Sequence, residues 1–211
     1  MKFQNVLILS PHTDDAELGC GGVIARLLEQ GADVHVAAFS QAEDSLPADS
    51  PRDLLKREFF QSMSVLRVPQ RNCRVFSYPV RRFPEFRQEV LEDLLKLKRE
   101  IRPELVLLPS GSDIHQDHQV VHQEGLRAFK EVSLLGYELP WNNCAFAAQA
   151  FVTLEERHVC QKWQALQAYE SQLRLGRSYF SEDFVRGLAK MRGTQIKSEW
   201  AEAFEVLRVV L

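Results

Sequence analysis

The residues best suited to chemistry follow an apolar run near the start of the chain. His12 and the adjacent carboxylates Asp14 and Asp15 stand directly after this run, and the glycine-rich segment Gly19–Gly22 comes next. Charged side chains beside a buried strand cost stability unless they have a partner. A divalent metal ion is the partner that this combination of imidazole and carboxylates indicates.

A second cluster of ionisable residues lies between Asp113 and His122. His115, His118 and His122 are spaced by three and four positions, so a helix would bring them onto one face, about 5–6 Å apart. A catalytic zinc ion commonly takes three ligands from histidine and carboxylate side chains and keeps one position for water. A ligand pair from the first cluster and one histidine from the second would supply that set, so not all three histidines need to bind.

Such a site is suited to the hydrolysis of an amide. The metal would lower the pKa of a bound water, and a neighbouring carboxylate that is not a ligand would take its proton. Asp14 and Asp15 can divide these two roles. A second histidine, held by Asp117 and protonated, would stabilise the oxyanion of a tetrahedral intermediate.

Both clusters follow short apolar runs that end at proline. Val6–Leu9 leads into Pro11, and Glu104–Leu108 leads into Pro109, a pattern that predicts two buried strands. In an open parallel sheet the carboxyl ends of the strands share one edge, and ligands bind there at a topological switch point. If these two strands are close neighbours, the two clusters therefore meet.

The remaining pattern is typical of an α/β protein with a mostly parallel sheet and helices on both faces, in three layers. Val6–Leu9, a helix from about Val23 to Gly31 and a strand over Asp33–Phe39 form a right-handed crossover unit. We expect one domain over residues 1–211. Further helices are expected over 51–66, 86–101, 155–173 and 183–191, strands over 73–78 and 204–210, and loops over 40–53, 79–84 and 137–141.

Composition argues against several classes of protein. The chain has 211 residues and a net charge of −3 with acids and bases interspersed, so a nucleic-acid partner is not expected. No signal-peptide pattern and no apolar run long enough to cross a bilayer is present, so we expect a cytoplasmic protein. A homo-oligomer is left open. The cysteines form no Cys-x-x-Cys pair and are expected to be buried reduced thiols: Cys20, Cys73, Cys144 and Cys160.

Other interpretations of the same residues stay open. Gly19–Gly22 can cradle a phosphate, with the acids holding magnesium in a nucleotide-binding protein, although two preceding carboxylates would repel a pyrophosphate and close helix packing is favoured. A sugar-binding module without turnover is another alternative. Five arginines can bind an anionic substrate tail, although a solvated surface position is the default: Arg71, Arg74, Arg81, Arg82 and Arg87.

Two motifs carry a resemblance to a known family: Pro-His-Thr-Asp-Asp at 11–15 and His-Gln-Asp-His at 115–118. Weaker agreement continues through Lys162 and 169–172 to 201–204, and so covers nearly the whole chain. The chain resembles the PIG-L/LmbE-like family of zinc-dependent de-N-acetylases. This resemblance implies a Rossmann-like sheet and a small-molecule substrate, an N-acetylamino sugar such as an N-acetylglucosamine conjugate, from which acetate is removed by hydrolysis.

The resemblance also implies roles for individual residues. Asp14 would be the general base, and His115 the electrostatic stabiliser, supported by Asp117. One zinc ion per chain, or another divalent metal, would be held by three ligands: His12, Asp15 and His118.

The chain departs from the family pattern at positions that bear on activity. Leu55 stands where an arginine is common, and Trp200 stands where many relatives carry a tyrosine that assists the oxyanion. These departures imply lower activity, a different substrate, or donation from another group. Two nearby arginines are candidates to replace the missing one: Arg52 and Arg57.

Overall fold

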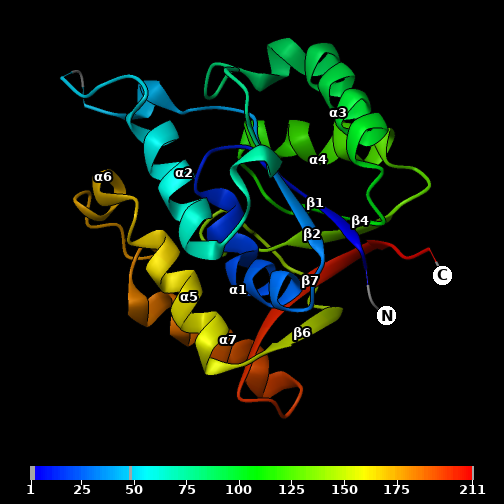
Figure 1. Ribbon diagram of the computed structural model, residues 1–211, viewed down its shortest axis with the longest axis vertical. Coiled ribbons are helices and arrows are strands. Elements are labelled where there is room, and N and C mark those ends of the chain that lie inside the picture. The colour runs from blue at the N-terminus through cyan, green and yellow to red at the C-terminus, as the bar shows by residue number, and fades with distance from the viewer. Residues whose placement is uncertain (1–2, 48, 211) are drawn as a thin grey trace.

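A seven-stranded sheet forms the centre of the fold (Figure 1). The structure, a computed structural model, describes residues 3–47 and 49–210. The strand order is β3-β2-β1-β4-β5-β7-β6, in which the first five strands of this order pair in parallel with one another and β7 runs antiparallel to both β5 and β6. The strands are β1 (Asn5–Ser10), β2 (Asp33–Ala38), β3 (Cys73–Val75), β4 (Leu105–Pro109), β5 (Ser133–Tyr137), β6 (Ala150–Leu154) and β7 (Trp200–Arg208).

Helices cover both faces of this sheet, with α3 and α4 on one face and α1, α2, α5 and α7 on the other (Figure 1). The prediction of a mostly parallel, three-layer α/β fold is therefore confirmed. The helices are α1 (Asp15–Glu29), α2 (Leu54–Leu66), α3 (Arg87–Ile101), α4 (Gln116–Ala128), α5 (Glu156–Leu166), α6 (Glu170–Leu173) and α7 (Glu182–Gln195), with short 3₁₀ turns η1 (Glu43–Ser45), η2 (Gln70–Asn72) and η3 (Phe83–Phe86).

The apolar run of β1 is buried on both sides because the strand lies between the two helical layers. Val6 and Ile8 pack into the core beneath α1, whereas Leu7 and Leu9 pack into the core beneath α3 and α4. Alternate residues of a strand point to opposite faces, so a strand covered on both faces shows a continuous apolar run. The sequence pattern over Val6–Leu9 has this origin.

The strand order places a topological switch point between β1 and β4. From β1 the chain continues outward through β2 and β3, and it then returns to β4 on the other side of β1. β1 and β4 are hydrogen-bonded neighbours, with Ile8 opposite Leu107. The segments after these strands therefore leave the same edge of the sheet next to one another, as the sequence predicts.

The glycines in the middle of α1 allow this helix to approach its neighbours closely. A Cβ atom at Gly19 would overlap the ring of Tyr137, and one at Gly21 would lie 2.9 Å from Cγ of Lys162. The amide of Gly22 donates to Glu202 at 3.1 Å, and Lys162 pairs with the same carboxylate at 2.7 Å. Close helix packing is thus confirmed as a use of these glycines.

Several elements differ from the sequence-based expectation. The expected helix over 155–173 is broken between α5 and α6, because Tyr169 turns inward and its hydroxyl bonds the carbonyl of Thr13 and the carboxylate of Glu17. The first helix starts at Asp15 and not near Val23. The last strand starts earlier than expected, at position 200, and the third strand is shorter.

β5, which lies between β4 and β7 in the sheet, is a strand that the sequence pattern does not predict. This strand has five residues and contains Gly136, a residue type that is depleted in strands. The glycine is required by packing, since a Cβ atom there would lie 2.9 Å from Cα of Ser110. A tertiary contact therefore decides the residue type, and the local pattern does not show it.

The cysteines are free, but the expectation that all four are buried is wrong. Cys20 and Cys73 are buried, Cys144 is exposed, and Cys160 is partly exposed. Cys144 follows the turn after β5 and lies outside any helix or strand. Its apolar neighbours in the sequence therefore do not indicate that its side chain is buried. In the part of the chain that the structure describes, no helix has the length and apolar content that crossing a membrane requires.

Candidate active site

A cavity of about 290 Å³ lies at the carboxyl ends of β1 and β4. Both clusters from the sequence analysis contribute to its lining. The first cluster arrives on the loop after β1 and the first turn of α1, and the second arrives on the loop after β4 and the first turns of α4. The prediction that the two clusters meet is confirmed.

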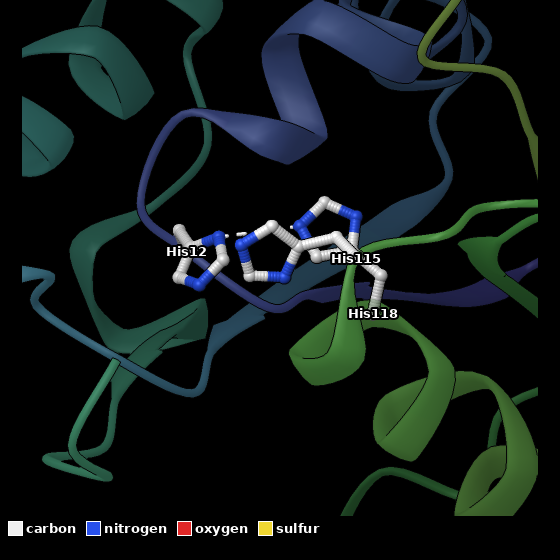
Figure 2. A group of neighbouring side chains, drawn as sticks. All are labelled: His12, His115 and His118. Carbon is white, nitrogen blue, oxygen red and sulfur yellow. Dashed lines mark hydrogen bonds between the residues drawn. The ribbon is translucent and has the colours of Figure 1, made fainter. Parts of the chain in front are cut away.

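Three donor atoms from the two clusters converge in this cavity. Nδ1 of His12 lies 3.1 Å from Oδ2 of Asp15, and Nε2 of His118 lies 3.2 Å from that nitrogen and 3.3 Å from that oxygen. Figure 2 shows the rings of His12, His115 and His118 gathered together, with a dashed line for the contact between His12 and His118. Nitrogen and oxygen donors in this arrangement suit a divalent metal ion.

Two buried carboxylates fix the orientation of the two imidazoles. Oδ2 of Asp113 lies 2.7 Å from Nδ1 of His118, and Oδ2 of Asp117 lies 3.0 Å from Nε2 of His12. A histidine that donates one ring N–H to a carboxylate presents its other nitrogen as a ligand. Asp113 had no assigned role in the sequence analysis, although its position just after the β4 run was a usable signal.

The charges of this cluster favour a cation. Burial opposes the charged imidazole of His118, but Asp15 and Asp113 outweigh it and raise its pKa to about 10. Burial likewise opposes the charged form of Asp15, yet the two imidazoles hold its pKa well below the ordinary range. The carboxylates therefore stabilise positive charge at this point, which a metal ion would supply as well as protons do.

His115 lines the cavity as expected, but a protonated imidazole was expected there and its surroundings favour the neutral form. It is the N-cap of α4, where its Nδ1 accepts the backbone N–H of Asp117 at 3.2 Å, and its ring centre lies 4.6 Å from that of His118. Burial and the neighbouring imidazoles His118 and His12 lower its pKa to about 4. A neutral imidazole whose Nδ1 accepts a bond carries its proton on Nε2.

The carboxylate of Asp117 does not hold His115, which corrects the expectation. It accepts from Nε2 of His12 and from the backbone N–H groups of Arg81 at 2.5 Å and Phe83 at 3.2 Å. The reason is the direction of the helix: Asp117 lies in the first turn of α4 and faces the loop after β3, whereas His115 precedes that turn.

Asp14 lines the cavity next to the three converging donors. It stands at the N-cap position of α1 but forms no capping hydrogen bond. Burial and the adjacent charge of Asp15 raise its pKa to about 6, while Arg177 opposes this shift. A carboxylate that is neither a helix cap nor one of the converging donors, and whose pKa lies near neutrality, is suited to proton transfer.

The loop that carries His12 and Asp14 is held from several sides. The Ser10 hydroxyl donates to the His12 carbonyl at 2.5 Å and accepts the backbone N–H of Ala16 at 3.0 Å. At the N-cap of α6, the hydroxyl of Tyr169 bonds the carbonyl of Thr13. In the sequence, Tyr169 belongs to the weaker family agreement at 169–172 but has no assigned role, because its contact depends on the break between two helices.

Some residues singled out in the sequence lie elsewhere. Nδ1 of His122 bonds the carbonyl of Pro109 at 2.8 Å, so this histidine does not join the converging donors. Trp200 is outside the cavity lining, and its ring packs against Lys190. Leu55 lines the cavity, whereas its expected replacements do not: Arg52 and Arg57.

Four of the five arginines considered as anion binders also lie outside the cavity lining, and three of them form ion pairs with carboxylates. Arg74 pairs with Glu100 at 3.5 Å. The other pairs are Arg82–Glu85 at 2.6 Å and Arg87–Glu124 at 2.5 Å. Arg81 is the one that lines the cavity.

Comparison with known proteins shows the family to which the chain belongs. The model of the PIG-L family, described as GlcNAc-PI de-N-acetylase, matches residues 7–129, more than half of the 211 residues. The chain belongs to this family. The matched region contains both clusters of the site.

Individual relatives agree with this family. An uncharacterized deacetylase of Escherichia coli (strain K12), YaiS, is 28% identical over 175 residues, which cover 81% of this chain and 92% of that protein. The N,N'-diacetylchitobiose deacetylase from Pyrococcus horikoshii superposes with a TM-score of 0.82 at 20% identity, covering 97% of this chain and 84% of that one. The chain is thus a member of a deacetylase family with a fold shared over nearly its whole length.

The same fold also occurs in an enzyme of another kind. GalB, the 4-carboxy-2-hydroxymuconate hydratase from Pseudomonas putida KT2440, superposes with a TM-score of 0.75 at 20% identity, covering 99% of this chain and 98% of that one. At such identities the superposition shows the fold alone, so the reaction has to be argued from the residues of the site.

Proposed function

We propose that this protein is a metal-dependent N-deacetylase that hydrolyses the acetamide of an N-acetylamino sugar conjugate of the N-acetylglucosamine type. One observation carries this proposal. Donor atoms of His12, Asp15 and His118 lie within 3.3 Å of one another. Beside them is the carboxylate of Asp14, which forms no helix-capping hydrogen bond. PIG-L family membership and the deacetylase relatives support the choice of acetamide over other hydrolysable bonds.

His12, Asp15 and His118 are the metal ligands of this proposal, with one zinc ion per chain. His115 also lies within 4.8 Å of the other two histidines and offers an alternative third ligand. Asp15 is preferred because Nδ1 of His115 already accepts a backbone N–H. The proton of the neutral ring is then on Nε2, which leaves no free nitrogen lone pair for a metal. A bound zinc ion would make a water molecule more acidic and draw electron density from the amide carbonyl.

The proton transfers of the reaction are assigned to Asp14. Its carboxylate takes the proton of the attacking water and delivers it to the sugar nitrogen as the C–N bond breaks, so that acetate and a free amine leave. A pKa raised by burial and by Asp15 to about 6 suits a group that must both accept and return a proton. Nε2–H of His115 donates a hydrogen bond to the oxygen that becomes negatively charged.

Asp113 and Asp117 act as positioning residues in this mechanism. They hold His118 and His12 so that one ring nitrogen of each faces the shared point in the cavity. The whole chain is proposed to act as one domain, since all strands belong to one sheet. A cytoplasmic location is part of the same proposal and rests on the sequence.

The decisive test measures acetate release by protein whose zinc content has been determined. The substrates are N-acetylglucosamine joined to nucleotide, malate and lipid carriers, together with N,N'-diacetylchitobiose. The expected result is stoichiometric zinc and release of acetate from at least one of them. Zinc-loaded protein that binds sugars but releases no acetate from any member of the panel would identify a binding module and overturn the proposal.

The choice between Asp15 and His115 as third ligand needs a separate measurement. Asp15→Asn is expected to lose most of the zinc, whereas His115→Gln is expected to retain it and to lose turnover. Zinc retained by the Asp15 variant and lost by the His115 variant would reverse the assignment.

A further inference from the structure

Arg81 is held in an unusual backbone conformation at the cavity. Its φ angle is 67°, in the left-handed region that glycine and asparagine adopt readily and other residues rarely do. The carboxylate of Asp117 fixes this conformation by accepting the N–H groups of Arg81 and Phe83. A long side chain at such a position is placed by the backbone, and this one lines the cavity.

A second guanidinium lines the same cavity from the loop between α6 and α7. Nη1 of Arg177 donates to the hydroxyl of Tyr179 at 2.8 Å, and its guanidinium carbon lies 5.9 Å from the centre of that ring. Tyr179 in turn stacks on Trp141, with ring centres 3.8 Å apart and planes inclined by 11°. The aromatic pair therefore orients Arg177 at the wall of the cavity.

Neither guanidinium has a carboxylate partner among the residues that the structure describes. The polar contacts of Arg81 beyond its backbone N–H are the carbonyl of Asp44, 3.5 Å from Nη2, and an amide N–H of Gln116, which its own carbonyl accepts. Arg177 contacts the hydroxyl of Tyr179. The neighbouring Arg82, by contrast, forms a two-bond pair with a glutamate.

In the described part of the chain, the acids of the cavity form no hydrogen bond or ion pair with Arg81 or Arg177, although the charge of Arg177 opposes the rise of the Asp14 pKa. Asp15 already binds His12 and His118, and in the proposed function a divalent cation adds further positive charge there. A substrate whose anionic group lies away from the acetamide would place negative charge near Arg81 and Arg177. Guanidinium groups bind phosphate and carboxylate oxygens in this way.

We propose that Arg81 and Arg177 bind an anionic substituent, a phosphate ester or a carboxylate, on the amino-sugar conjugate that this site deacetylates. This inference rests on the proposed function, since it names the class of substrate. It assigns to the two arginines a role in specificity and not in the chemical step.

The experiment compares charged and neutral ligands on zinc-loaded protein. The ligands are N-acetylglucosamine 1-phosphate, N-acetylglucosamine 6-phosphate, N-acetylmuramic acid and neutral N-acetylglucosamine. The variants are Arg81→Asn, which keeps a residue that tolerates the left-handed backbone, and Arg177→Gln. Arg82→Gln and Arg174→Gln remove the same charge from exposed arginines that pair with glutamates, and serve as matched controls.

The readouts are kcat and KM for acetate release, and binding measured by calorimetry on zinc-loaded protein carrying Asp14→Asn to slow turnover. The wild type is expected to prefer at least one anionic ligand over the neutral sugar by about 10-fold or more. Each arginine variant is expected to raise KM and the dissociation constant for that ligand about 10-fold, with binding of the neutral sugar little changed. An unchanged kcat is expected for Arg81→Asn only, because Arg177→Gln also removes a charge that acts on Asp14. The controls are expected to behave as the wild type. Preference for the phosphates identifies a phosphate group, and preference for the muramic acid identifies a carboxylate.

The outcomes separate this inference from the proposed function. Acetate release that is equal for charged and neutral sugars, or unchanged in both variants, overturns the anion site and leaves the deacetylase. Selective binding of an anionic sugar that is lost in the variants, without acetate release from any sugar, supports the anion site and overturns the deacetylase. An anionic ligand that contacts only the metal would bind the variants as tightly as the wild type, and this result overturns the inference. Absence of binding by all three anionic ligands overturns it as well.

Discussion

The carboxylate of Asp117 lies 3.0 Å from Nε2 of His12, although the two residues are 105 positions apart in the chain. The same carboxylate accepts the backbone N–H groups of Arg81 and Phe83. Asp117 is completely buried, so it has no water to replace these partners. It therefore links the orientation of a proposed metal ligand to the loop that carries a proposed substrate-binding arginine.

Replacing Asp117 by asparagine is expected to weaken zinc binding without removing a ligand. Loss of the charged partner of His12 lowers the basicity of its other nitrogen, and such partners typically change metal affinity by about 10–100-fold. Competition with a chromogenic chelator measures the effect. Asp53→Asn, at an exposed aspartate that pairs with Arg57, is the control and is expected to bind zinc like the wild type. Unchanged zinc affinity in the Asp117 variant would remove its positioning role.

Substitutions of the adjacent residues Asp14 and Asp15 are expected to have different effects on zinc content and turnover. Asp14→Asn should keep zinc and lower kcat by about 10²–10⁴-fold, the range for loss of a general base. Asp15→Asn should lower zinc content itself, because its Oδ2 lies 3.1 Å and 3.3 Å from the two histidine nitrogens. Zinc content and acetate release measured on the same preparations distinguish the two. Full turnover by the Asp14 variant would show that another group accepts the proton.

The place of the site was predictable because it depends on local signals. Buried parallel strands show continuous apolar runs, and those of β1 and β4 end close to Pro11 and at Pro109. Ionisable residues directly after such runs must lie at one edge of the sheet. The family motifs then gave the same residues, and the structure brings them within hydrogen-bonding distance.

The contacts around the site were not predictable, because tertiary packing decides them. The sequence-based expectation was that the carboxylate of Asp117 holds His115, but the first turn of α4 directs this carboxylate to His12. Arg177 and Tyr179 lie on a loop without periodicity, and they reach the cavity only because α6 ends early. Arg81 was one of five similar arginines, and only its backbone conformation and position distinguish it.

Tyr169→Phe is expected to reduce both stability and turnover. The hydroxyl bonds the carbonyl of Thr13 and lies 2.8 Å from the carboxylate of Glu17, whose other oxygen has no hydrogen-bond partner among the described residues. The Glu17 oxygen keeps the hydroxyl of Ser62 as a donor in the variant, but the buried carbonyl of Thr13 loses the Tyr169 hydroxyl. Leaving such a buried acceptor without this donor costs about 1–3 kcal/mol in the free energy of unfolding. The loop with Asp14 also loses a restraint, so kcat is expected to fall about 10-fold or more.

Urea denaturation and acetate release measure these two effects of Tyr169→Phe. Tyr78→Phe is the control, because its hydroxyl bonds Asp93 at a half-buried position outside the cavity lining. It is expected to lose less stability and to keep its turnover. A Tyr169 variant as active and as stable as the wild type would show that α6 does not hold the loop.

The Glu29 carboxylate is expected to contribute stability that depends on pH. It bonds Arg157 at 2.8 and 3.0 Å and His158 at 2.9 Å, and so ties the end of α1 to the start of α5. These partners, Arg157 first, lower its pKa from 4.5 to about 2. Because the pKa is depressed in the folded state, the contribution is fully present above about pH 4.5 and is lost as the pH falls from about 4.5 to about 2.

Glu29→Gln tests this dependence through thermal unfolding at several pH values. The variant should melt about 1–3 °C below the wild type at pH 7, a small effect because the pair is solvent-exposed, and the difference should shrink towards zero below pH 3. Glu170→Gln, at an exposed carboxylate that contacts Arg174 at 3.2 Å, is the matched control and should show a smaller difference at pH 7. A difference between wild type and Glu29→Gln that stays constant down to pH 3 would mean that the lost contact acts through packing and not through the charge of Glu29.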